Sequence, residues 1–290
     1  MMKRVIALGF FDSLHKGHRK LISEAKALAE ETGAKVCVCT FDDYFLDLLT
    51  NGAEKEIFTL DERKRLLSEM GVGCVKVIES SVDRFSQSGE EFFEEMVACG
   101  EPAAFVCGRD YRFGKNAAWG AEELAKMCEA RGILLKVTDT VMSGDHKVSS
   151  TEIRKMLAEG DIECANELLG RMYFCAGKVV RGRGDGRKFG YPTANLGILK
   201  QKLLPAFGVY KTITEVEGKA YASLTNVGGQ PTFDIEKPTI ETLIMNFEGN
   251  IYGKDIVINF VRRIRGIRKF PSPEALKEQI EKDKLEASRD

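Results

Sequence analysis

The sequence lacks an excess of charge of either sign, because 43 lysine and arginine residues face 44 aspartate and glutamate residues. The resulting net charge of −1 removes any overall attraction to nucleic acid or to an anionic membrane. The chain also lacks an apolar run near the roughly 18 residues that can cross a bilayer. We therefore expect no nucleic-acid and no membrane partner. Any site for an anionic ligand has to be built locally.

Cysteine spacings typical of metal sites are absent as well. The eight cysteines are scattered, and no C-x-x-C pair occurs. Most of them lie in apolar runs, where a free cysteine behaves as a small buried hydrophobe. The spacing indicates reduced, structural thiols rather than a zinc site or a disulfide framework.

The basic start of the chain is followed by a short apolar run, residues 5–11, which imitates a signal peptide. Asp12 and His15 end this run, and no cleavage site of small residues follows. We therefore expect a cytoplasmic protein. The sequence carries no signal for a particular oligomeric state.

Strand and helix signals alternate over residues 1–170. Short apolar runs predict strands, and apolar residues spaced three and four apart predict helices. Thr59 with Glu62 and Ser88 with Glu91 form capping-box patterns that begin two helices. The predicted strands are 5–11, 34–41, 72–78, 103–107 and 133–137, and further helices are predicted at 16–32, 149–159 and 161–169. This alternation predicts an α/β domain with a parallel sheet and helices on its faces.

The pattern changes after Gly170 to strand signals followed by one helix. The predicted strands are 174–180, 208–217, 221–227, 240–247 and 255–262. The helix begins near Ser272, with Pro273 at its first position. Residues 171–290 are therefore predicted to form an antiparallel β-barrel with a C-terminal helix.

Two of the three histidines, His15 and His18, lie where the first predicted strand meets the first predicted helix. In an open parallel sheet this crevice is the expected ligand site, and a helix N-terminus there favours a phosphate. Gly9 and Gly17 permit close backbone approach. Two imidazoles at such a place can stabilise charge on a phosphoryl group during in-line displacement. An H-x-x-H pair on a polar loop is weak evidence by itself.

The surrounding residues strengthen this interpretation. Gly9-Phe-Phe-Asp12 followed by His15-Lys-Gly-His18 resembles the G-x-F-D-x-x-H-x-G-H signature of the nucleotidyltransferase superfamily. Residues 108–114 (GRDYRFG) and 148–154 (VSSTEIR) resemble two segments of bacterial FAD synthetases. The resemblance implies a Rossmann-like nucleotidyltransferase domain that adenylylates FMN to FAD with ATP and releases pyrophosphate.

The same resemblance assigns residues to that reaction. It implies that His15, His18 and Arg154 are catalytic. The implied ATP-binding residues are Gly9, Phe11, Asp12, Gly17, Ser149, Ser150 and Thr151, and those holding flavin or adenine are Asp110, Tyr111 and Phe113.

The residues of these two segments also allow simpler interpretations. Hydroxyls at 149–151 can face one anion together with Arg154, one helical turn on. Ser149 with Glu152 also fits an ordinary capping box, and both can hold at once. Aromatic residues in a loop such as 108–114 are as often simply packed.

Two positions depart from the family pattern. Relatives have Pro-His-Pro after T-F-x, whereas this chain reads Thr40-Phe-Asp-Asp-Tyr-Phe45, and Ser13 stands in place of a glycine. Two carboxylates near a phosphate site are expected to repel FMN. The departure therefore favours an alternative in which the first domain has lost or altered its adenylyltransferase activity.

A glycine-rich, basic segment opens the second domain. Residues 181–191 hold four glycines and four cations, which predicts a mobile loop that can fold over ATP phosphates. Pro192-Thr-Ala-Asn195 follows and resembles the G-[FY]-P-T-A-N motif of riboflavin kinases. The resemblance implies that Thr193 and Asn195 offer Mg²⁺ hard oxygen ligands. The implied ATP-binding residues of the kinase are Gly182, Gly184, Gly190, Thr193 and Asn195.

Glu241 lies in an otherwise apolar predicted strand, where alternation alone makes it an outward-facing residue. Residues 240–243 (IETL) resemble the riboflavin kinase segment that carries the catalytic glutamate. The resemblance implies that Glu241 takes the proton from the ribityl hydroxyl of riboflavin. Residues 268–272 (RKFPS) resemble the flavin-side segment, which implies that Arg268 and Phe270 contact flavin.

The motifs occur in family order over nearly the whole chain and predict a bifunctional riboflavin kinase and FAD synthetase. Its substrates and products would be riboflavin, FMN, FAD and ATP, with Mg²⁺ as cofactor. Three alternatives stay open: a kinase alone, a flavin-binding regulatory module without turnover, and adenylylation of another phosphate ester.

Overall fold

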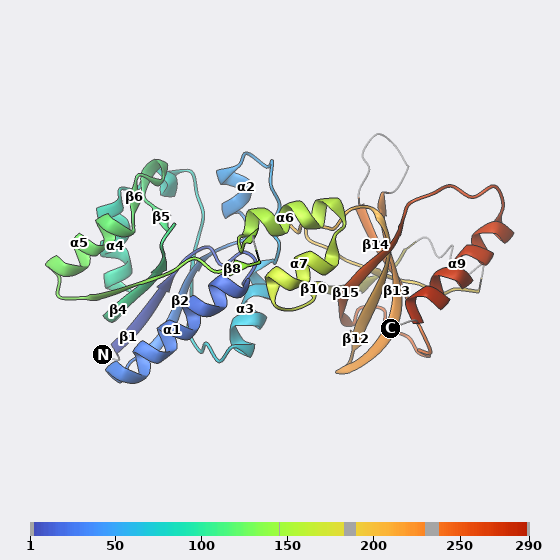
Figure 1. The fold of residues 1–290 in the computed structure, drawn as a ribbon, viewed down its shortest axis with the longest axis horizontal. Coiled ribbons are helices and arrows are strands. Elements are labelled where there is room, and N and C mark those ends of the chain that lie inside the picture. Colours follow the sequence, from blue (N-terminus) through green and yellow to red (C-terminus); the bar gives the residue numbers. More distant parts are fainter. Residues whose placement is uncertain (1–2, 145, 183–189, 230–237, 289–290) are drawn as a thin grey trace. The chain divides into compact units, whose positions relative to one another are not determined.

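The computed structural model describes residues 3–144, 146–182, 190–229 and 238–288. The chain divides into two compact units, Met1–Ser150 and Thr151–Asp290. Each unit has its own sheet or barrel, and each is described by itself (Figure 1).

The first unit contains a parallel sheet of strand order β3-β2-β1-β4-β7. The chain adds strands on one side of β1 and then returns to its other side with β4, so a crevice opens at the carboxyl ends of β1 and β4. The strands are β1 (Lys3–Leu8), β2 (Lys35–Phe41), β3 (Val75–Ile78), β4 (Glu101–Gly108) and β7 (Leu134–Thr138).

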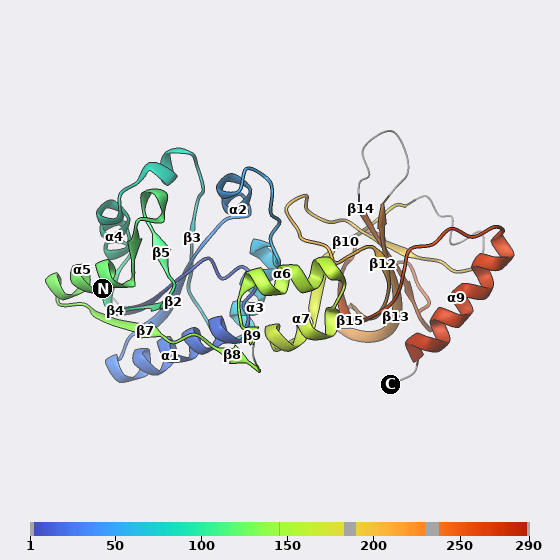
Figure 2. The same cartoon turned by 45° about the horizontal axis from the view of Figure 1, so that its top comes forward.

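Helices cover both faces of this sheet (Figure 2). The buried face of α1 (Lys16–Thr32) packs on β1, β2 and β4. On the opposite face, Phe92 and Leu124 join strand residues such as Phe105 in one apolar cluster. These two residues belong to α4 (Gly89–Ala98) and α5 (Ala121–Ala130). The remaining elements are α2 (Phe45–Leu49), α3 (Leu60–Glu69), β5 (Arg112–Phe113), β6 (Trp119–Gly120), β8 (Met142–Ser143), β9 (His146–Lys147) and 3-10 helices at Asp83–Ser86 and Lys115–Ala117.

The second unit contains a closed barrel of order β10-β11-β14-β13-β12-β15, in which neighbouring strands are antiparallel. A tight turn at Glu217 and Gly218, both with positive φ, joins β12 to β13. The strands are β10 (Tyr173–Val180), β11 (Ala194–Leu196), β12 (Gly208–Val216), β13 (Lys219–Gly229), β14 (Pro238–Ile244) and β15 (Asp255–Gly266), and α9 (Pro273–Ser288) follows them.

Alternation along the strands separates the inside of the barrel from its outer wall. Thr225 and Thr242 are fully buried, and their hydroxyls lie 2.9 Å apart. Thr212 and Ser223 extend this hydroxyl cluster through contacts of 2.7 Å. Since successive strand residues point to opposite faces, the neighbours of these threonines point outward.

Two helices that precede the barrel in the chain are hydrogen-bonded to barrel strands: α6 (Ser150–Glu159) and α7 (Ile162–Leu169). The Asn166 amide donates to the Phe260 carbonyl at 2.9 Å and accepts from the Tyr173 N–H at 2.6 Å. The Arg263 guanidinium donates to the Glu159 carbonyl at 3.2 Å. These bonds explain why the division of the chain falls before α6 rather than after α7.

The predicted fold class is confirmed: a parallel α/β unit precedes an antiparallel barrel with a C-terminal helix. Both predicted capping boxes form. Strand β11 was missed, because three residues inside a motif give no strand signal of their own. The predicted boundary at residues 170 and 171 stays a prediction.

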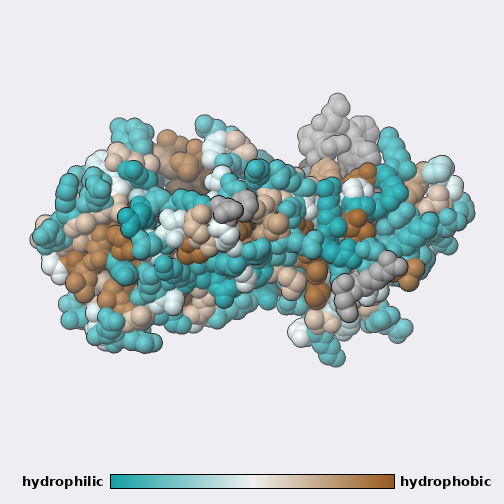
Figure 3. All heavy atoms as spheres, in the orientation of Figure 1, coloured by the Kyte–Doolittle hydropathy of each residue, from teal (hydrophilic) through white to brown (hydrophobic). Residues whose placement is uncertain are grey.

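The surface shows no large apolar area on the face drawn in Figure 3, where hydrophobic residues form small separate groups among hydrophilic ones. Such scattered residues are normal on a folded surface. Within the described part of the chain, no helix has both the length and the apolar character needed to span a bilayer.

A truncation experiment tests where the barrel domain begins. A fragment of residues 171–290 loses α6 and α7, which removes the partners of the Phe260 carbonyl and the Tyr173 N–H. Each buried polar group left unsatisfied costs about 1–3 kcal/mol. We expect the fragment 151–290 to unfold cooperatively in urea and the fragment 171–290 to be less stable by at least about 2 kcal/mol. Equal stabilities would place the boundary at residue 171.

Candidate active sites

A turn with an uncommon backbone joins β1 to α1. Phe11 and Leu14 have φ of 55° and 45°, a left-handed region that costs energy for residues other than glycine. Both side chains are buried, at 1% and 0% exposed. Gly9 has no side chain, and a Cβ there would lie 3.1 Å from the Phe11 ring. The surrounding structure therefore holds this turn in place.

His15 is the N-cap of α1. Its Nδ1 accepts a hydrogen bond from the His18 backbone N–H at 3.1 Å. An accepting Nδ1 carries no proton, so in the neutral ring the proton is on Nε2. A Cβ on Gly17 would lie 3.0 Å from the His15 ring, which explains why glycine stands there. The cap thus fixes His15 with an N–H donor at the far end of its ring.

The rings of His15 and His18 are stacked, with centroids 3.8 Å apart and an interplanar angle of 7°. Burial lowers the pKa of His15 to about 4 and lowers that of His18 well below its ordinary value, and the charge of His15 lowers the pKa of His18 further. Both rings are therefore neutral at pH 7. The Nδ1 atom of His18 is buried and has no hydrogen-bond partner among the described residues, so it is available to a ligand.

The motif residues Asp12 and Ser13 contact other segments of the unit. The Asp12 carboxylate accepts from the Ile57 N–H at 2.9 Å and is 1% exposed. The Ser13 hydroxyl lies 2.9 Å from that of Ser150, the first residue of α6. Ser13, a departure from the family pattern, thus links the turn to the hydroxyl-rich segment. The Asp12 carboxylate is buried against the backbone, and this position disfavours direct contact with ATP.

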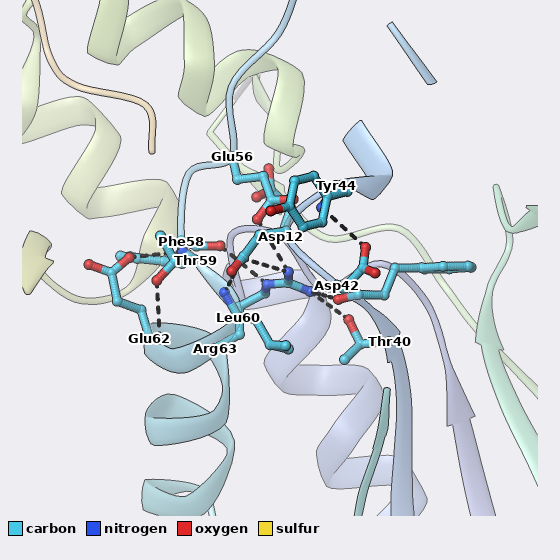
Figure 4. A network of polar contacts seen from close by, with 12 residues as sticks. Asp12, Thr40, Asp42, Tyr44, Glu56, Phe58, Thr59, Leu60, Glu62 and Arg63 are labelled. Carbon is cyan, nitrogen blue, oxygen red and sulfur yellow. Dashed lines mark hydrogen bonds and ion pairs between the residues drawn. The ribbon is translucent and has the colours of Figure 1, made fainter. Parts of the chain in front are cut away.

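Arg63 on α3 connects this turn to the ends of β1 and β2 (Figure 4). Its side chain is 0% exposed and donates to the carbonyls of Phe10, Phe41 and Phe58 at 2.9–3.3 Å. It also donates to the Thr40 hydroxyl at 2.8 Å and to the Glu56 carboxyl at 3.2 Å. The buried guanidinium thereby joins segments that are distant in sequence.

Near Arg63, the carboxylates of Asp42 and Asp43 accept hydrogen bonds from backbone N–H groups. Asp42 accepts from the N–H groups of Tyr44 and Ser80 at 3.1 and 2.9 Å. Asp43 accepts from the Leu60 N–H, and its Oδ1 lies 3.6 Å from Arg63 Nη2. These carboxylates accept from backbone N–H groups, and Arg63 offsets the charge of Asp43. The expectation that they oppose a phosphate stays a prediction.

The three residues predicted to hold a flavin or adenine ring lie after β4 in different surroundings. Phe113 is 6% exposed and packs on Phe92 in the apolar cluster, and Tyr111 stacks on Phe113 with centroids 5.5 Å apart. The prediction that Phe113 holds a flavin or adenine ring is not favoured, because its ring is part of the core. Asp110 is exposed and pairs with Lys147 at 3.0 Å. Its charge raises the pKa of His15, which indicates that it lies near the histidine pair.

The hydroxyl-rich segment spans the division between the two units. Ser149 and Ser150 end the first unit, while Thr151 and Arg154 begin the second on the first turn of α6. The roles of Ser149, Thr151 and Arg154 stay predictions.

A row of polar side chains crosses the outer wall of the barrel. Glu241 on β14 is paired with Asn195 on β11 and with Asn226 on β13. Their neighbours Thr242 and Thr225 point inward, so the row points outward. All three residues are half-buried.

The glycine-rich segment reaches this row at Gly182. A Cβ there would lie 2.2–2.6 Å from the amide atoms of Asn195, so only glycine fits. Thr193 immediately precedes β11 and lies two residues before Asn195. Gly190 has φ of 85°, a conformation that glycine adopts freely, whereas Gly184 lies outside the described residues. Two neutral oxygen donors this close in sequence suit a hard cation such as Mg²⁺.

Helix α9 borders the row and is held by ion pairs. Arg265 on β15 makes a bidentate pair with the 2% exposed Asp283, with nitrogen–oxygen distances of 2.7–3.1 Å. The Phe270 ring has the guanidinium carbons of Arg265 and Arg268 at 5.6 and 5.9 Å. Arg268 is exposed and Phe270 half-buried, so both are accessible to a ligand.

The two units match two family models. The FAD synthetase model matches residues 1–152, and the riboflavin kinase model matches residues 169–289. A bifunctional riboflavin kinase/FMN adenylyltransferase from Bacillus subtilis is 36% identical, with 99% of this chain and 92% of that protein covered. The chain belongs to this bifunctional family. The Escherichia coli K12 member is 30% identical, with 98% of this chain and 91% of that protein covered.

A solved structure shares the whole fold of this family member. It is that of a protein named macrolide-efflux protein, from Streptococcus pneumoniae, with a TM-score of 0.86 and 32% identity. The similarity covers 98% of this chain and 93% of that chain. The name of that protein refers to another activity and is not carried over, because both family models describe flavin enzymes.

Sequence reasoning missed Arg63 and Glu56. The family resemblance included Asn226, in residues 226–228 (NVG), but gave it no role. An arginine on an amphipathic helix is ordinarily a surface residue, so nothing in the pattern marked Arg63 for burial. Asn226 follows Leu224 at the strand period of two, and its pairing with Glu241 depends on register. The burial of Arg63 becomes visible only where α3 meets the ends of β1 and β2, and the pairing of Asn226 with Glu241 becomes visible only in the strand register.

The pH dependence of stability tests the Arg63 network. Burial raises the pKa of Glu56 to about 9; Arg63 opposes this rise, and the hydrogen bond and charge of Asp43 and the charge of Asp12 add to it. A raised carboxyl pKa means that the folded protein holds a proton that the unfolded chain loses near pH 4.5. The unfolding free energy therefore falls as pH rises from about 4.5 to 9, by at most about 1.4 kcal/mol per pH unit.

Glu56→Gln removes this titration. We expect the unfolding free energy of Glu56→Gln minus that of the unaltered chain to rise steadily between pH 5 and 8.5. Urea unfolding at each pH measures both values. Glu54→Gln, at an exposed position two residues away, is the control and should show no such trend. A constant difference for Glu56→Gln would mean that Glu56 is ionised in the folded protein.

Proposed function

We propose that the chain phosphorylates riboflavin to FMN with ATP and then adenylylates FMN to FAD with a second ATP. The observation that carries the proposal is the presence of two separate sites in one family member. One is a stacked neutral histidine pair after the carboxyl end of β1, the central strand of the parallel sheet. The other is a glutamate paired with Asn195 on a barrel.

In the kinase reaction, Glu241 takes the proton of the ribityl hydroxyl as that oxygen bonds to the γ-phosphorus of ATP. The bond between the γ-phosphorus and ADP breaks, and ADP leaves. Thr193 and Asn195 would hold Mg²⁺, which supplies positive charge beside the phosphates. Gly182 and Gly190 border the segment that binds ATP, and Arg268 and Phe270 bind the flavin.

In the adenylyl transfer, a phosphate oxygen of FMN bonds to the α-phosphorus of ATP and pyrophosphate leaves. Neutral His15 and His18 contribute N–H donors toward the charge that develops on the phosphoryl oxygens. A neutral donor needs no proton transfer and keeps its proton throughout. Arg154 and the hydroxyls of Ser149, Ser150 and Thr151 assist at the phosphates.

Other residues of the first site act less directly. Gly9 and Gly17 allow the backbone close to the nucleotide, whereas Phe11 and Asp12 shape the turn. Asp110 and Tyr111 remain candidates for holding a ring. The cytoplasmic location expected from the sequence belongs to the same proposal.

Chromatography of products separates the two activities. Incubation with riboflavin, ATP and Mg²⁺ should yield FMN and FAD. Glu241→Gln should slow riboflavin phosphorylation by about 10²–10⁴ and spare FAD formation from added FMN. His18→Ala should slow FAD formation by about 10²–10³ and spare phosphorylation. Near-normal rates in either variant would remove that residue from its reaction, and FMN without FAD from the unaltered chain would support a kinase alone.

Substitutions of His15 separate its capping role from its donor role. Asparagine can replace the accepting Nδ1 but cannot reach the position of Nε2, whereas glutamine reaches Nε2 but leaves the cap open. We expect His15→Asn to keep the melting temperature and lose about 10²-fold or more in FAD formation. His15→Gln should lose about 1 kcal/mol of stability and retain more activity. The reverse order of activities would show that the cap, not the donor, matters for the reaction.

A further inference from the structure

The row on the outer wall of the barrel extends beyond the residues that motif resemblance assigns. Asn195 and Asn226 flank Glu241 on its two neighbouring strands. Directly opposed side chains in an antiparallel sheet have Cβ atoms about 4.5–5.5 Å apart, which is within reach of an amide and a carboxylate. Glu241 is therefore placed between two amides.

The two amides differ in their surroundings. The Asn195 amide lies against the backbone of Gly182, at the stem of the glycine-rich segment. The Asn226 amide lies over Gly228, where an added Cβ would be 3.4 Å from Nδ2. Gly228 is buried and has no side chain to fill this space, so the amide of Asn226 stays beside the glutamate strand. Asn195 thus lies beside Gly182, whereas Asn226 lies beside Gly228.

An uncharged partner can orient the Glu241 carboxylate without lowering its ability to accept a proton. Along its own strand and face the neighbours are Thr239 and Leu243, and across the sheet they are the two asparagines. Beyond Asn226, the row continues across Val209 on β12 to Arg265 on β15, whose charge Asp283 on α9 offsets. An amide N–H can hold a carboxylate in one orientation without neutralising it, whereas a cation would reduce its ability to accept a proton.

We propose that Asn226 is a positioning residue of the kinase site, whose amide orients the Glu241 carboxylate toward the hydroxyl that is phosphorylated. The inference rests on the proposed function of Glu241. It assigns a task to Asn226, to which the family resemblance gave no role. A hydrogen bond to a charged group contributes enough that its loss changes a rate by about 10- to 100-fold.

The pH profile of riboflavin phosphorylation tests this role. Asn226→Asp keeps the shape of the side chain but places a second carboxylate beside Glu241. Like charges oppose ionisation, so the acid limb of the kcat/KM profile should move up by about one pH unit or more. Asn250→Asp, in an exposed turn of the same unit, adds the same charge and should leave the profile unchanged.

Asn226→Ala completes the test without a change of charge. We expect kcat for phosphorylation to fall about 10- to 100-fold while KM for riboflavin and FAD formation from FMN stay unchanged. An unshifted acid limb in Asn226→Asp, or an unchanged kcat in Asn226→Ala, would overturn the inference. Failure of the proposed base is distinguishable, since in that case Glu241→Gln itself retains turnover.

Discussion

The guanidinium of Arg63 lies buried where the first two strands of the sheet end. Its donors reach the carbonyls of Phe10, Phe41 and Phe58, which belong to the ends of β1 and β2 and to the segment before α3. Without this group each of these carbonyls would lose a donor, and the Phe10 carbonyl would keep the Thr40 hydroxyl, at 2.6 Å. A buried carbonyl left without any donor costs about 1–3 kcal/mol. The position of the histidine turn therefore depends on a residue 45 positions beyond His18.

The bonds around Arg63 form a closed circuit. Arg63 holds the Phe10 carbonyl, the Asp12 carboxylate accepts from the Ile57 N–H, and Glu56, next to Ile57, returns to Arg63. Between Phe10 and His15 lie the two residues of positive φ. Backbone in such conformations costs of order 1–3 kcal/mol and persists only where surrounding contacts determine it. The circuit supplies those contacts, and the turn in consequence presents His15 at the N-terminus of α1.

The sequence predicts the elements that depend on local signals. Helix α1 spans the predicted residues 16–32, since its apolar spacing and Gly33 agree. The segment 42–60 was not predicted, because its folding depends on distant partners: Ser80 for Asp42, and Arg63 for Asp43 and Glu56. The same limit applies to the barrel. Motif residues at Asn195 and Glu241 were identified, but Asn226 becomes significant only through strand register.

A chain with a net charge of −1 can handle substrates as anionic as ATP and FMN because it uses neutral donors at fixed positions. Burial keeps the histidine pair uncharged at pH 7, and two amides flank Glu241. Preorganised dipoles stabilise developing charge without a strong field over the whole surface. In the proposed kinase reaction, an amide can orient the Glu241 carboxylate without the loss of basicity that a neighbouring cation would cause. In the proposed reactions, neutral groups thus act at both sites. Histidine N–H donors face the anionic transition state of adenylyl transfer, and asparagine amides flank the carboxylate that accepts a proton.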